Sequence, residues 1–246
     1  MTIPRIYIEK DKIEDNLIIA DKDAFHKISH VLRSKKGDKL IFFDGSGTEY
    51  ETIAESFSKN LCTCKIITKK THSYNETNKF SLLLGILKKD KMESSIEKAV
   101  QLGVSEIIPL KCERTQVKIN NGKEEEKKKR WEKIAIEACA LSRRVYVPKI
   151  FHPLPVNEAL PKIADANRKI LLWEREQKRM KDILHNKIGK KNQKIVIAIG
   201  PEGGFTESEA KSFMSSGFIS ASLGDHILSA DTAVIYALSI LKYLTE

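Results

Sequence analysis

Long apolar runs are missing from this sequence of 246 residues. No stretch approaches the roughly 18 consecutive apolar residues that a membrane-spanning helix needs. The first residues, Met-Thr-Ile-Pro-Arg, also lack the apolar core of a secretory signal. We therefore expect a cytoplasmic protein that does not enter a membrane.

Cysteine is scarce, and the four cysteines form no CxxC pair. Zinc sites usually need two close pairs of Cys or His ligands, so we expect no metal site. Cys62 and Cys64 are two residues apart and would share one face of a strand. The cysteines, which also include Cys112 and Cys139, are predicted to be free buried thiols in a reducing compartment.

The familiar nucleotide-binding motifs are absent too. The chain has neither the GK[ST] of a P-loop nor a G-x-G-x-x-G, which disfavours an ATP or NAD enzyme of the usual kinds. Hydrophobic residues make up 41% of the chain, so it can bury a core as one large domain or two small ones. The net charge of +10 favours a polyanionic partner, although a general bias toward lysine would also explain it.

Residues 1–70 are predicted to form a compact β-rich domain. Short β-like segments alternate with turn residues, including a clear turn at 44–47. Residues 71–79 are polar and without periodicity, which is typical of a linker. The expected strands are Arg5–Ile8, Asn16–Ile19, Lys39–Phe43, Glu49–Ser56 and Leu61–Thr68, with a short helix at Asp23–Arg33.

Residues 80–246 show alternating strands and helices, which predicts an α/β domain with a parallel sheet. Several strands are continuously apolar, as in a sheet covered on both faces. The last helix is apolar on most sides and is expected to be buried. The expected strands are Phe80–Leu84, Ile107–Leu110, Lys169–Trp173 and Ile195–Ile199, and the expected helices are Lys91–Leu102, Glu124–Ser142 and Thr232–Leu244.

The stretch 195–217 carries the clearest chemical signal. A buried strand ends in Gly200-Pro201-Glu202-Gly203-Gly204-Phe205, and Thr206 with Glu209 then forms a capping box for a helix that Gly217 closes. Ligands of open α/β sheets bind at this edge, although a plain strand-to-helix turn remains the alternative. A second loop runs from Gly224 to Asp231, the expected N-cap of the last helix.

Several motifs together resemble one known family. Gly200-Pro201-Glu202-Gly203-Gly204, Leu223-Gly224 and Leu228-x-x-Asp231-Thr232-Ala233 are similar to the cofactor loops of SPOUT methyltransferases, and more narrowly of the RsmE family. The resemblance covers nearly the whole chain. Pro4-Arg5-Ile6-Tyr7, His30-Val31-Leu32-Arg33 and Phe43-Asp44-Gly45 resemble that family's PUA-like domain, and Lys91-Met92-Glu93, the segment 98–104 and Glu113-Arg114 resemble the start of its catalytic domain.

The resemblance implies a PUA-like domain followed by a SPOUT domain with a deep trefoil knot, an exception to the rule that chains do not thread their own loops. It implies a homodimer with the active site near the interface. It implies methyl transfer from S-adenosylmethionine (SAM) to N3 of a uridine in 16S ribosomal RNA, either as naked RNA or in the assembled small subunit. The SAM-binding residues it implies are Leu172, Gly200, Pro201, Glu202, Gly203, Gly204, Leu223, Gly224, Leu228 and Thr232.

The sequence also departs from the family pattern. Arg143 stands where a small residue is usual, whereas Arg144 keeps the following arginine. His226, Ser229 and Asp231 replace two arginines and a glutamate, which weakens the transfer of any catalytic arginine to that loop. Our catalytic candidates are Arg144 for stabilising charge or positioning a phosphate, His226 as a general base, and Glu202 for orienting SAM or facing its sulfonium.

Five cations at family motifs are candidates for RNA binding: Arg5, Arg33, Lys88, Lys91 and Arg114. Each could instead be an ordinary surface charge, just as Arg144 could end a helix and His226 could simply be solvated. Three other functions stay open. They are an RNA-binding protein that has lost catalysis, a methyltransferase for another RNA position, and a different nucleotide-using enzyme.

Overall fold

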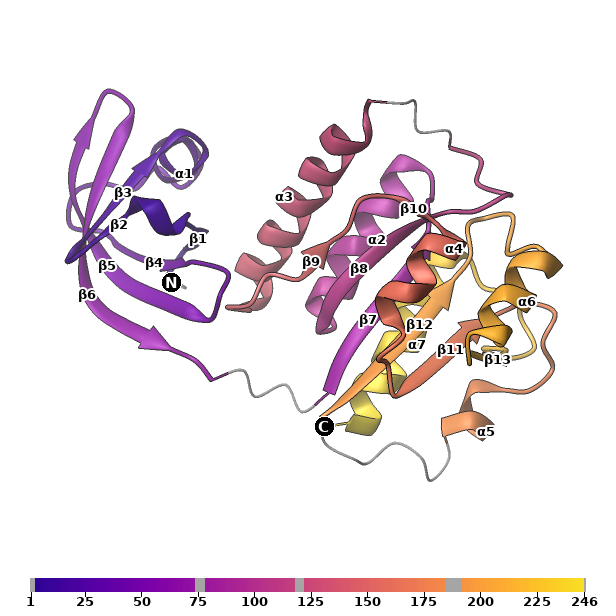
Figure 1. The fold of residues 1–246 in the computed structure, drawn as a ribbon. Coiled ribbons are helices and arrows are strands. Elements are labelled where there is room, and N and C mark those ends of the chain that lie inside the picture. The colour runs from indigo at the N-terminus through magenta and orange to yellow at the C-terminus, as the bar shows by residue number, and fades with distance from the viewer. Residues whose placement is uncertain (1–2, 74–77, 118–121, 185–191, 246) are drawn as a thin grey trace. The chain divides into compact units, whose positions relative to one another are not determined.

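The computed structural model describes residues 3–73, 78–117, 122–184 and 192–245 (Figure 1). The chain forms two compact units, and the smaller one is discontinuous in sequence. It contains the N-terminal 75 positions together with residues 136–147, whereas residues 76–135 and 148–246 form the larger unit. No helix among the described residues is long and apolar enough to cross a membrane.

The smaller unit is built on a six-stranded sheet with the order β1-β4-β5-β6-β3-β2. The long strands β5 and β6 form an antiparallel hairpin at its centre, and β1 lies parallel to β4. The β-rich prediction is confirmed. The strands are β1 (Arg5–Tyr7), β2 (Ile13–Glu14), β3 (Leu17–Asp21), β4 (Lys39–Phe43), β5 (Thr48–Ser58) and β6 (Leu61–Thr71).

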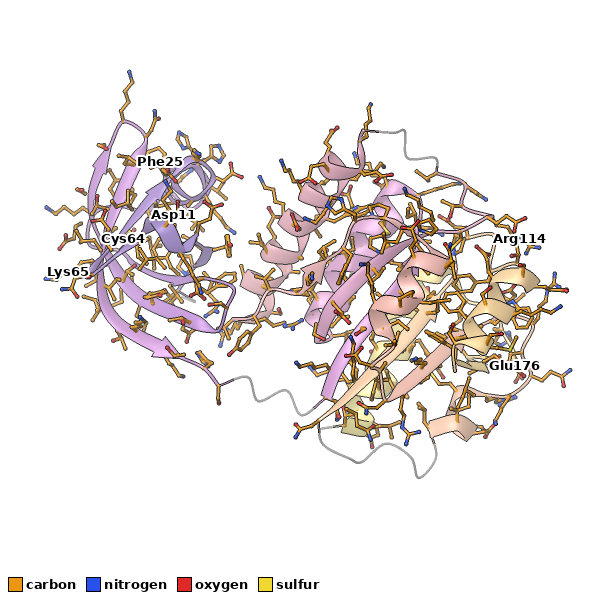
Figure 2. All side chains as sticks on the ribbon, in the orientation of Figure 1. Asp11, Phe25, Cys64, Lys65, Arg114 and Glu176 are labelled. Carbon is orange, nitrogen blue, oxygen red and sulfur yellow. The ribbon has the colours of Figure 1, made fainter. Side chains whose placement is uncertain are left out.

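One face of this sheet packs on a short helical segment to make the core of the smaller unit. The segment runs through α1 (Lys22–His26) into a π-helical turn, η2 (Lys27–Val31), where the sequence predicted one helix. Cys62 and Cys64 are fully buried and free, and their sulfur atoms lie 3.5 Å apart on the same face of β6. Cys64 points into this core whereas Lys65 points away from it (Figure 2), as strand alternation requires.

A returning segment of chain completes the smaller unit. Beyond α3 (Glu124–Ser142), the backbone of residues 145–147 pairs with the turn at 45–47. Gly47 N–H donates to the Val145 carbonyl at 3.1 Å, and Val147 N–H donates to the Gly45 carbonyl at 3.0 Å. The hydroxyl of Tyr146 donates to the carbonyl of His72 at 2.7 Å. These bonds explain why this segment groups with the N-terminal strands.

The larger unit is an α/β layer structure whose described strand pairs are all parallel, as the sequence predicted. Its sheet has the order β10-β8-β7-β12-β11-β13, with β9 also pairing with β8. The strands are β7 (Asn78–Gly85), β8 (Val104–Lys111), β9 (Lys149–Ile150), β10 (Leu154–Pro155), β11 (Arg168–Leu172), β12 (Gln193–Ile199) and β13 (Ile219–Ala221). The expected linker at 71–79 is shorter in the structure, because β6 continues to Thr71 and β7 begins at Asn78.

Helices cover both faces of this sheet. Leu83, Leu171 and Val196 share a core cluster with residues of α4 (Val156–Ala159) and α6 (Glu207–Ser215). Helices α2 (Lys89–Gln101) and α7 (Ala230–Thr245) pack against each other and contact β8 and β12, respectively. Two further short helices are η3 (Leu160–Ile163) and α5 (Met180–Leu184), with η1 (Lys10–Lys12) in the smaller unit. The trefoil knot that the resemblance implies remains a prediction.

Helix α7 corrects two expectations. It begins at Ala230, and the carbonyl of Ser229 accepts the first helical bond from Ala233 N–H at 2.8 Å, so Ser229 and not Asp231 is the N-cap. Only one face of the helix is buried. The opposite face exposes the apolar side chains of Ile235, Tyr236 and Tyr243. The prediction of a buried helix is therefore correct for one face of α7 and wrong for the opposite face.

The predicted capping box at the start of α6 is confirmed. Thr206 Oγ1 accepts from Glu209 N–H at 3.3 Å, and Glu209 Oε2 accepts from Thr206 N–H at 2.8 Å. We expect Thr206→Ala to lower the free energy of unfolding by about 1 kcal/mol, because one helix-terminal donor loses its partner. The midpoint of urea unfolding measures this change. Ser208→Ala, which alters an exposed serine within the same helix, is the control and should shift the midpoint much less.

Candidate active site at the carboxyl edge of the sheet

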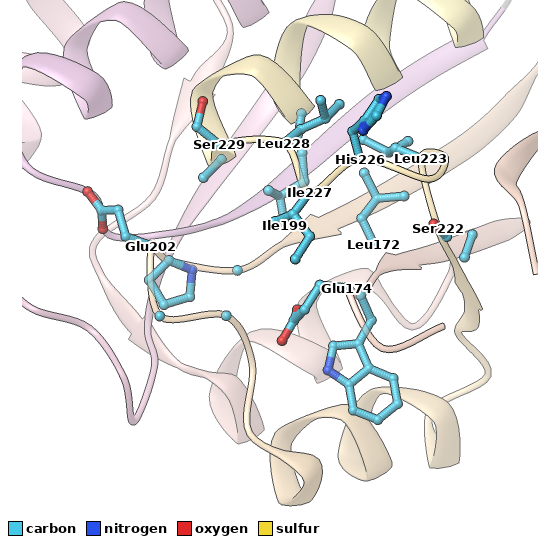
Figure 3. Close-up of a pocket in the computed structure, with 18 of the residues that line it drawn as sticks. Leu172, Glu174, Ile199, Glu202, Ser222, Leu223, His226, Ile227, Leu228 and Ser229 are labelled. Atoms are coloured by element: carbon cyan, nitrogen blue, oxygen red, sulfur yellow. The ribbon is translucent and has the colours of Figure 1, made fainter. Parts of the chain in front are cut away.

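Three loops meet at one edge of the larger sheet. Strands β12, β11 and β13 are neighbours and parallel, so the chain leaves Ile199, Leu172 and Ala221 at the same edge. The three loops enclose a cavity of about 410 Å³ (Figure 3). This volume lies within the range of roughly 300–1,000 Å³ that holds small organic ligands, at the position where α/β sheets bind them.

The cavity has apolar walls and a few polar groups. Leucine and isoleucine side chains come from the ends of β11 and β12 and from the loop after β13. The polar groups belong mainly to glutamates, a lysine and a histidine. The lining residues are Lys91, Leu172, Trp173, Glu174, Ile199, Gly200, Pro201, Glu202, Gly203, Gly204, Ala221, Ser222, Leu223, Gly224, His226, Ile227, Leu228, Ser229, Ala230 and Ala233.

The glycine loop forms one wall through its backbone. Gly204 has a φ of +68° and donates its N–H to the carbonyl of Pro201 at 2.9 Å, which closes a tight turn. A Cβ on Gly204 would lie 2.7 Å from Oε1 of Glu174. The turn therefore needs glycine both for its left-handed backbone and because the Glu174 carboxylate lies against it.

Two polar atoms of the lining residues are buried without hydrogen-bond partners in the described part of the chain. Glu202 accepts a hydrogen bond from Lys88 N–H at 3.0 Å through Oε1, but its Oε2 has no partner. Nε1 of Trp173 is likewise buried and has no partner among the described residues. Buried polar atoms are nearly always paired in folded proteins, so these two are suited to contact a bound ligand.

The loop at 222–229 is held from outside the cavity. Ser222 exchanges backbone hydrogen bonds with the segment 178–180, at 2.8 Å to the Lys178 carbonyl and 2.9 Å from Met180 N–H. Nη2 of Arg179 lies 2.6 Å from Oδ1 of Asp225. This bracing fixes the loop while leaving Ile227 84% exposed at the cavity.

An ion pair joins two helix N-termini at the cavity. Nζ of Lys91, in the first turn of α2, lies 3.6 Å from Oδ1 of Asp231, in the first turn of α7. Burial of the Asp231 carboxyl opposes its ionisation. The nearby Ser229 hydroxyl, the backbone and the Lys91 ammonium outweigh that effect and hold the pKa of Asp231 below its usual value. Asp231 is therefore a carboxylate at neutral pH.

The predicted cofactor residues come together well. All of them line the cavity except Thr232, which is exposed and pairs its hydroxyl with that of Ser229 at 2.9 Å. The catalytic candidates Glu202 and His226 line the cavity as well. Arg144 is not among the lining residues, and it lies in the segment 136–147 that groups with the smaller unit. Its catalytic role stays a prediction.

The predicted RNA-binding cations lie in different surroundings. Lys91 lines the cavity, Lys88 is exposed beside Glu202, and Nη1 of Arg114 donates to the Gly203 carbonyl at 3.2 Å. Arg33 is exposed at the end of η2 in the smaller unit. The fifth candidate, Arg5, does not fit the prediction.

The guanidinium of Arg5 is buried within the smaller unit. Its side chain is 9% exposed, its Nη1 lies 2.7 Å from Oε2 of Glu49, and it stacks 5.5 Å from the ring centre of Phe43. An arginine that is paired and covered in this way has little surface left for a phosphate. We therefore remove Arg5 from the RNA-binding candidates.

Sequence reasoning missed several lining residues, notably Trp173, Glu174 and Ser222. The signal was present, because Trp173 and Glu174 directly follow an apolar strand and so had to emerge at the same edge as the glycine loop. Among the residues that the structure describes, no cluster of three or more His, Cys, Asp or Glu side chains could hold a metal ion.

Two family models match this chain. A model described as an RNA methyltransferase domain matches residues 75–242, and one described as an RNA methyltransferase PUA domain matches residues 17–67. Together they match residues of both units. A PUA-like domain followed by a methyltransferase domain, as expected from the sequence, is thereby confirmed.

Similar proteins cover almost the whole chain. The ribosomal RNA small subunit methyltransferase E of Bacillus subtilis is 31% identical over 91% of this chain and 89% of its own, and that of Rickettsia conorii is 32% identical over 99% and 97%. A Legionella pneumophila methyltransferase solved with bound SAM superposes with a TM-score of 0.91, at 29% identity over 100% of this chain and 99% of its own. The SAM-bound ribosomal RNA small subunit methyltransferase E of Neisseria gonorrhoeae has a TM-score of 0.87, at 27% identity over 99% and 98%. The chain therefore belongs to the family of ribosomal RNA small subunit methyltransferases E, the RsmE family.

Proposed function

We propose that this chain is a SAM-dependent methyltransferase that transfers a methyl group to N3 of a uridine in 16S ribosomal RNA. The observation that carries the proposal is the cavity at the carboxyl edge, which almost all of the predicted cofactor residues line. Membership of the RsmE family and the likeness to SAM-bound structures support it. We place the reaction in the cytoplasm, where ribosomal RNA would be its substrate.

The cavity suits SAM chemically. The adenine ring and the carbons around the sulfonium need apolar walls, which Leu172, Ile199 and Leu228 provide. The sulfonium and the ammonium of SAM are cationic, and the carboxylates of Glu174 and Glu202 supply complementary charge. When bound, SAM supplies an electrophilic methyl group.

The protein's part in the chemistry is to prepare N3 of the uracil. This nitrogen carries a proton at neutral pH and is a poor nucleophile until it loses that proton. We assign proton acceptance to the imidazole of His226, which lines the cavity. Imidazole is the side chain that most often serves as a general base in enzymes. We assign orientation of the cofactor to Glu202, whose Oε2 is free to accept a hydrogen bond.

We infer that the chain acts as a homodimer. The exposed stripe on α7 contains Thr232, Ile235, Tyr236, Ser239 and Tyr243, whose spacing places them on one helix face. Contiguous exposed apolar surface of this kind is typical of an interface between protein chains. The loop that ends at Ser229 leads directly into this helix, so a partner bound there would lie close to the cavity.

Analysis of ribosomal RNA nucleosides by mass spectrometry tests the activity. RNA from cells that lack the gene should lose one N3-methyluridine, and the purified protein with SAM should restore it. Calorimetry with SAM separates the rival functions. A protein that binds RNA but not SAM would be a non-catalytic relative, and methylation of another nucleotide would show a different RNA target.

Arg33 should contribute to RNA affinity and not to chemistry. Binding to a phosphate releases counterions, so Arg33→Glu should weaken RNA binding and reduce the slope of log affinity against log salt by about one for each phosphate that is no longer bound. Titrations of RNA at several salt concentrations measure this. The affinity for SAM should stay unchanged, because the cavity residues belong to the larger unit.

Lys59→Glu is the matched control for Arg33→Glu, since it makes a comparable change of charge at the exposed turn between β5 and β6. If both variants weaken RNA binding equally, only the overall charge matters. If Arg33→Glu leaves RNA affinity unchanged at low salt, Arg33 merely ends its helical segment. A cation at the C-terminal end of a helix stabilises that helix by about 0.3–1 kcal/mol, so the loss of Arg33 would lower the melting temperature slightly.

A further inference from the structure

Lys91 has a distinct position among the basic residues of the larger unit. Among the described residues that line the cavity, it alone is a lysine or an arginine. It projects from the first turn of α2, and its side chain is 43% exposed. Arg114, another basic residue at a family motif, does not line the cavity. Its Nη1 donates a hydrogen bond to the carbonyl of Gly203.

The surroundings of Lys91 favour negative charge in the cavity. Helices α2 and α7 both begin there, and helix N-termini carry partial positive charge from their unpaired N–H groups. Asp231 lies 3.6 Å from the Lys91 ammonium. Because Asp231 is attached to α7 and Lys91 to α2, the pair holds the ammonium at the point where the two helices meet.

We propose that Lys91 is a catalytic residue that stabilises the negative charge of the uracil ring in the transition state, and that Asp231 is its positioning residue. This inference rests on the proposed function. Removing the N3 proton leaves a charge that is shared by N3 and the two ring carbonyl oxygens. An ammonium group close to either oxygen lowers the barrier electrostatically, as an oxyanion hole does.

The step balances without any further reactant. The N3–H bond breaks, and the proton passes to His226 and then to solvent. The electron pair left on N3 forms the new bond to the methyl carbon, and the pair of the breaking carbon–sulfur bond returns to sulfur, which becomes a neutral thioether. Lys91 has no lone pair as an ammonium, so it takes no proton and is unchanged by the reaction.

Single-turnover methylation at saturating RNA and SAM tests this role. Lys91→Met keeps most of the stem of the side chain and removes the charge, and it should lower the rate by about 10²–10³-fold, the usual effect of losing one such donor. Its affinity for SAM, measured by calorimetry, should change little. Lys91→Arg should restore part of the rate.

Lys98→Met is the matched control, because Lys98 also lies on α2, is 40% exposed and pairs with a carboxylate, Glu97, at 2.9 Å. It lies outside the cavity and should leave the rate unchanged. Asp231→Asn should lower the rate less than Lys91→Met, and Asp231→Glu should recover most of the loss. These comparisons separate the position of Lys91 from a general loss of positive charge.

A modified substrate distinguishes charge stabilisation from phosphate binding. Fluorine at C5 makes the uracil N3–H more acidic, so less charge stabilisation is needed. With 5-fluorouridine at the target, the ratio of the wild-type methylation rate to the Lys91→Met rate should therefore be smaller. The pH at which the rate levels off should also be higher in the variant. The proposal would be overturned if 5-fluorouridine left this ratio of rates unchanged and the pH profile of the variant matched that of wild type. It would also be overturned if Lys91→Met weakened only the affinity for RNA. If the wild-type protein methylates no uridine N3, the proposed function fails instead.

Discussion

Replacing Gly85 with alanine is expected to collapse the glycine loop and to weaken SAM binding by more than about tenfold. A Cβ on Gly85, the last residue of β7, would lie 2.3 Å from the backbone nitrogen of Pro201 and 2.7 Å from the carbonyl carbon of Gly200. These atoms belong to the chain that leaves β12, which is paired with β7 along its length. They cannot move without disturbing the pairing of β7 with β12, so the added methyl group overpacks the site.

The same substitution should lower the free energy of unfolding by about 1–3 kcal/mol, the usual range for overpacking a well-filled core. Calorimetry with SAM and chemical denaturation measure the two effects. Gly103→Ala is the control, because a Cβ there meets nothing within 4 Å and only the φ of +94° is strained. It should reduce stability and leave SAM affinity intact. If Gly85→Ala binds SAM like wild type, the loop does not form the cofactor site.

The double variant Ile235→Glu, Tyr236→Glu is expected to convert a homodimer into a monomer. Both side chains are more than two-fifths exposed on the outer face of α7, at 41% and 46%. If this face is the interface, each substitution places a charge in a buried apolar contact. Losses of about 2 kcal/mol or more are common at such central positions, and each 1.4 kcal/mol corresponds to a tenfold weaker association.

Sedimentation at micromolar concentration measures the change directly. Wild type should sediment as a dimer, and the double variant should approach the chain mass of 27.9 kDa. Met214→Glu, at an exposed apolar position on α6, is the control and should remain dimeric. A wild-type protein that sediments only as the monomer would contradict both the prediction and the proposed interface.

Local patterns in the sequence predicted most of the fold. The continuous apolar run of β12 and the capping box at Thr206 act over a few residues, so they can be recognised without knowing the rest of the structure. The limits of α3 were predicted because acidic residues begin the helix and its apolar stripe continues to its end. The cofactor loops were predicted from such local patterns and from the family resemblance.

What failed depended on contacts between residues far apart in the chain. Arg5 was predicted to bind RNA because arginine suits phosphate contacts and this one lies in a family motif. Its actual partner, Glu49, is 44 positions away and could not be inferred from the motif. The ion pair of Lys91 with Asp231 could not be predicted either, because nothing in the sequence places α2 against α7. Asp231 and Ser229 are both good caps, and only the backbone hydrogen bond from Ala233 decides between them.

The return of residues 136–147 to the smaller unit has a consequence for the order of synthesis. An N-terminal domain of continuous sequence can fold as soon as it leaves the ribosomal tunnel. Here residues 76–147 must be added after the N-terminal strands before Tyr146 can reach the His72 carbonyl. At about 5–20 residues per second, these 72 residues take roughly 4–14 s. During that interval the nascent N-terminal sheet lacks its last segment. Completion of the smaller unit therefore waits on the translation of residues 76–135, the first part of the larger unit.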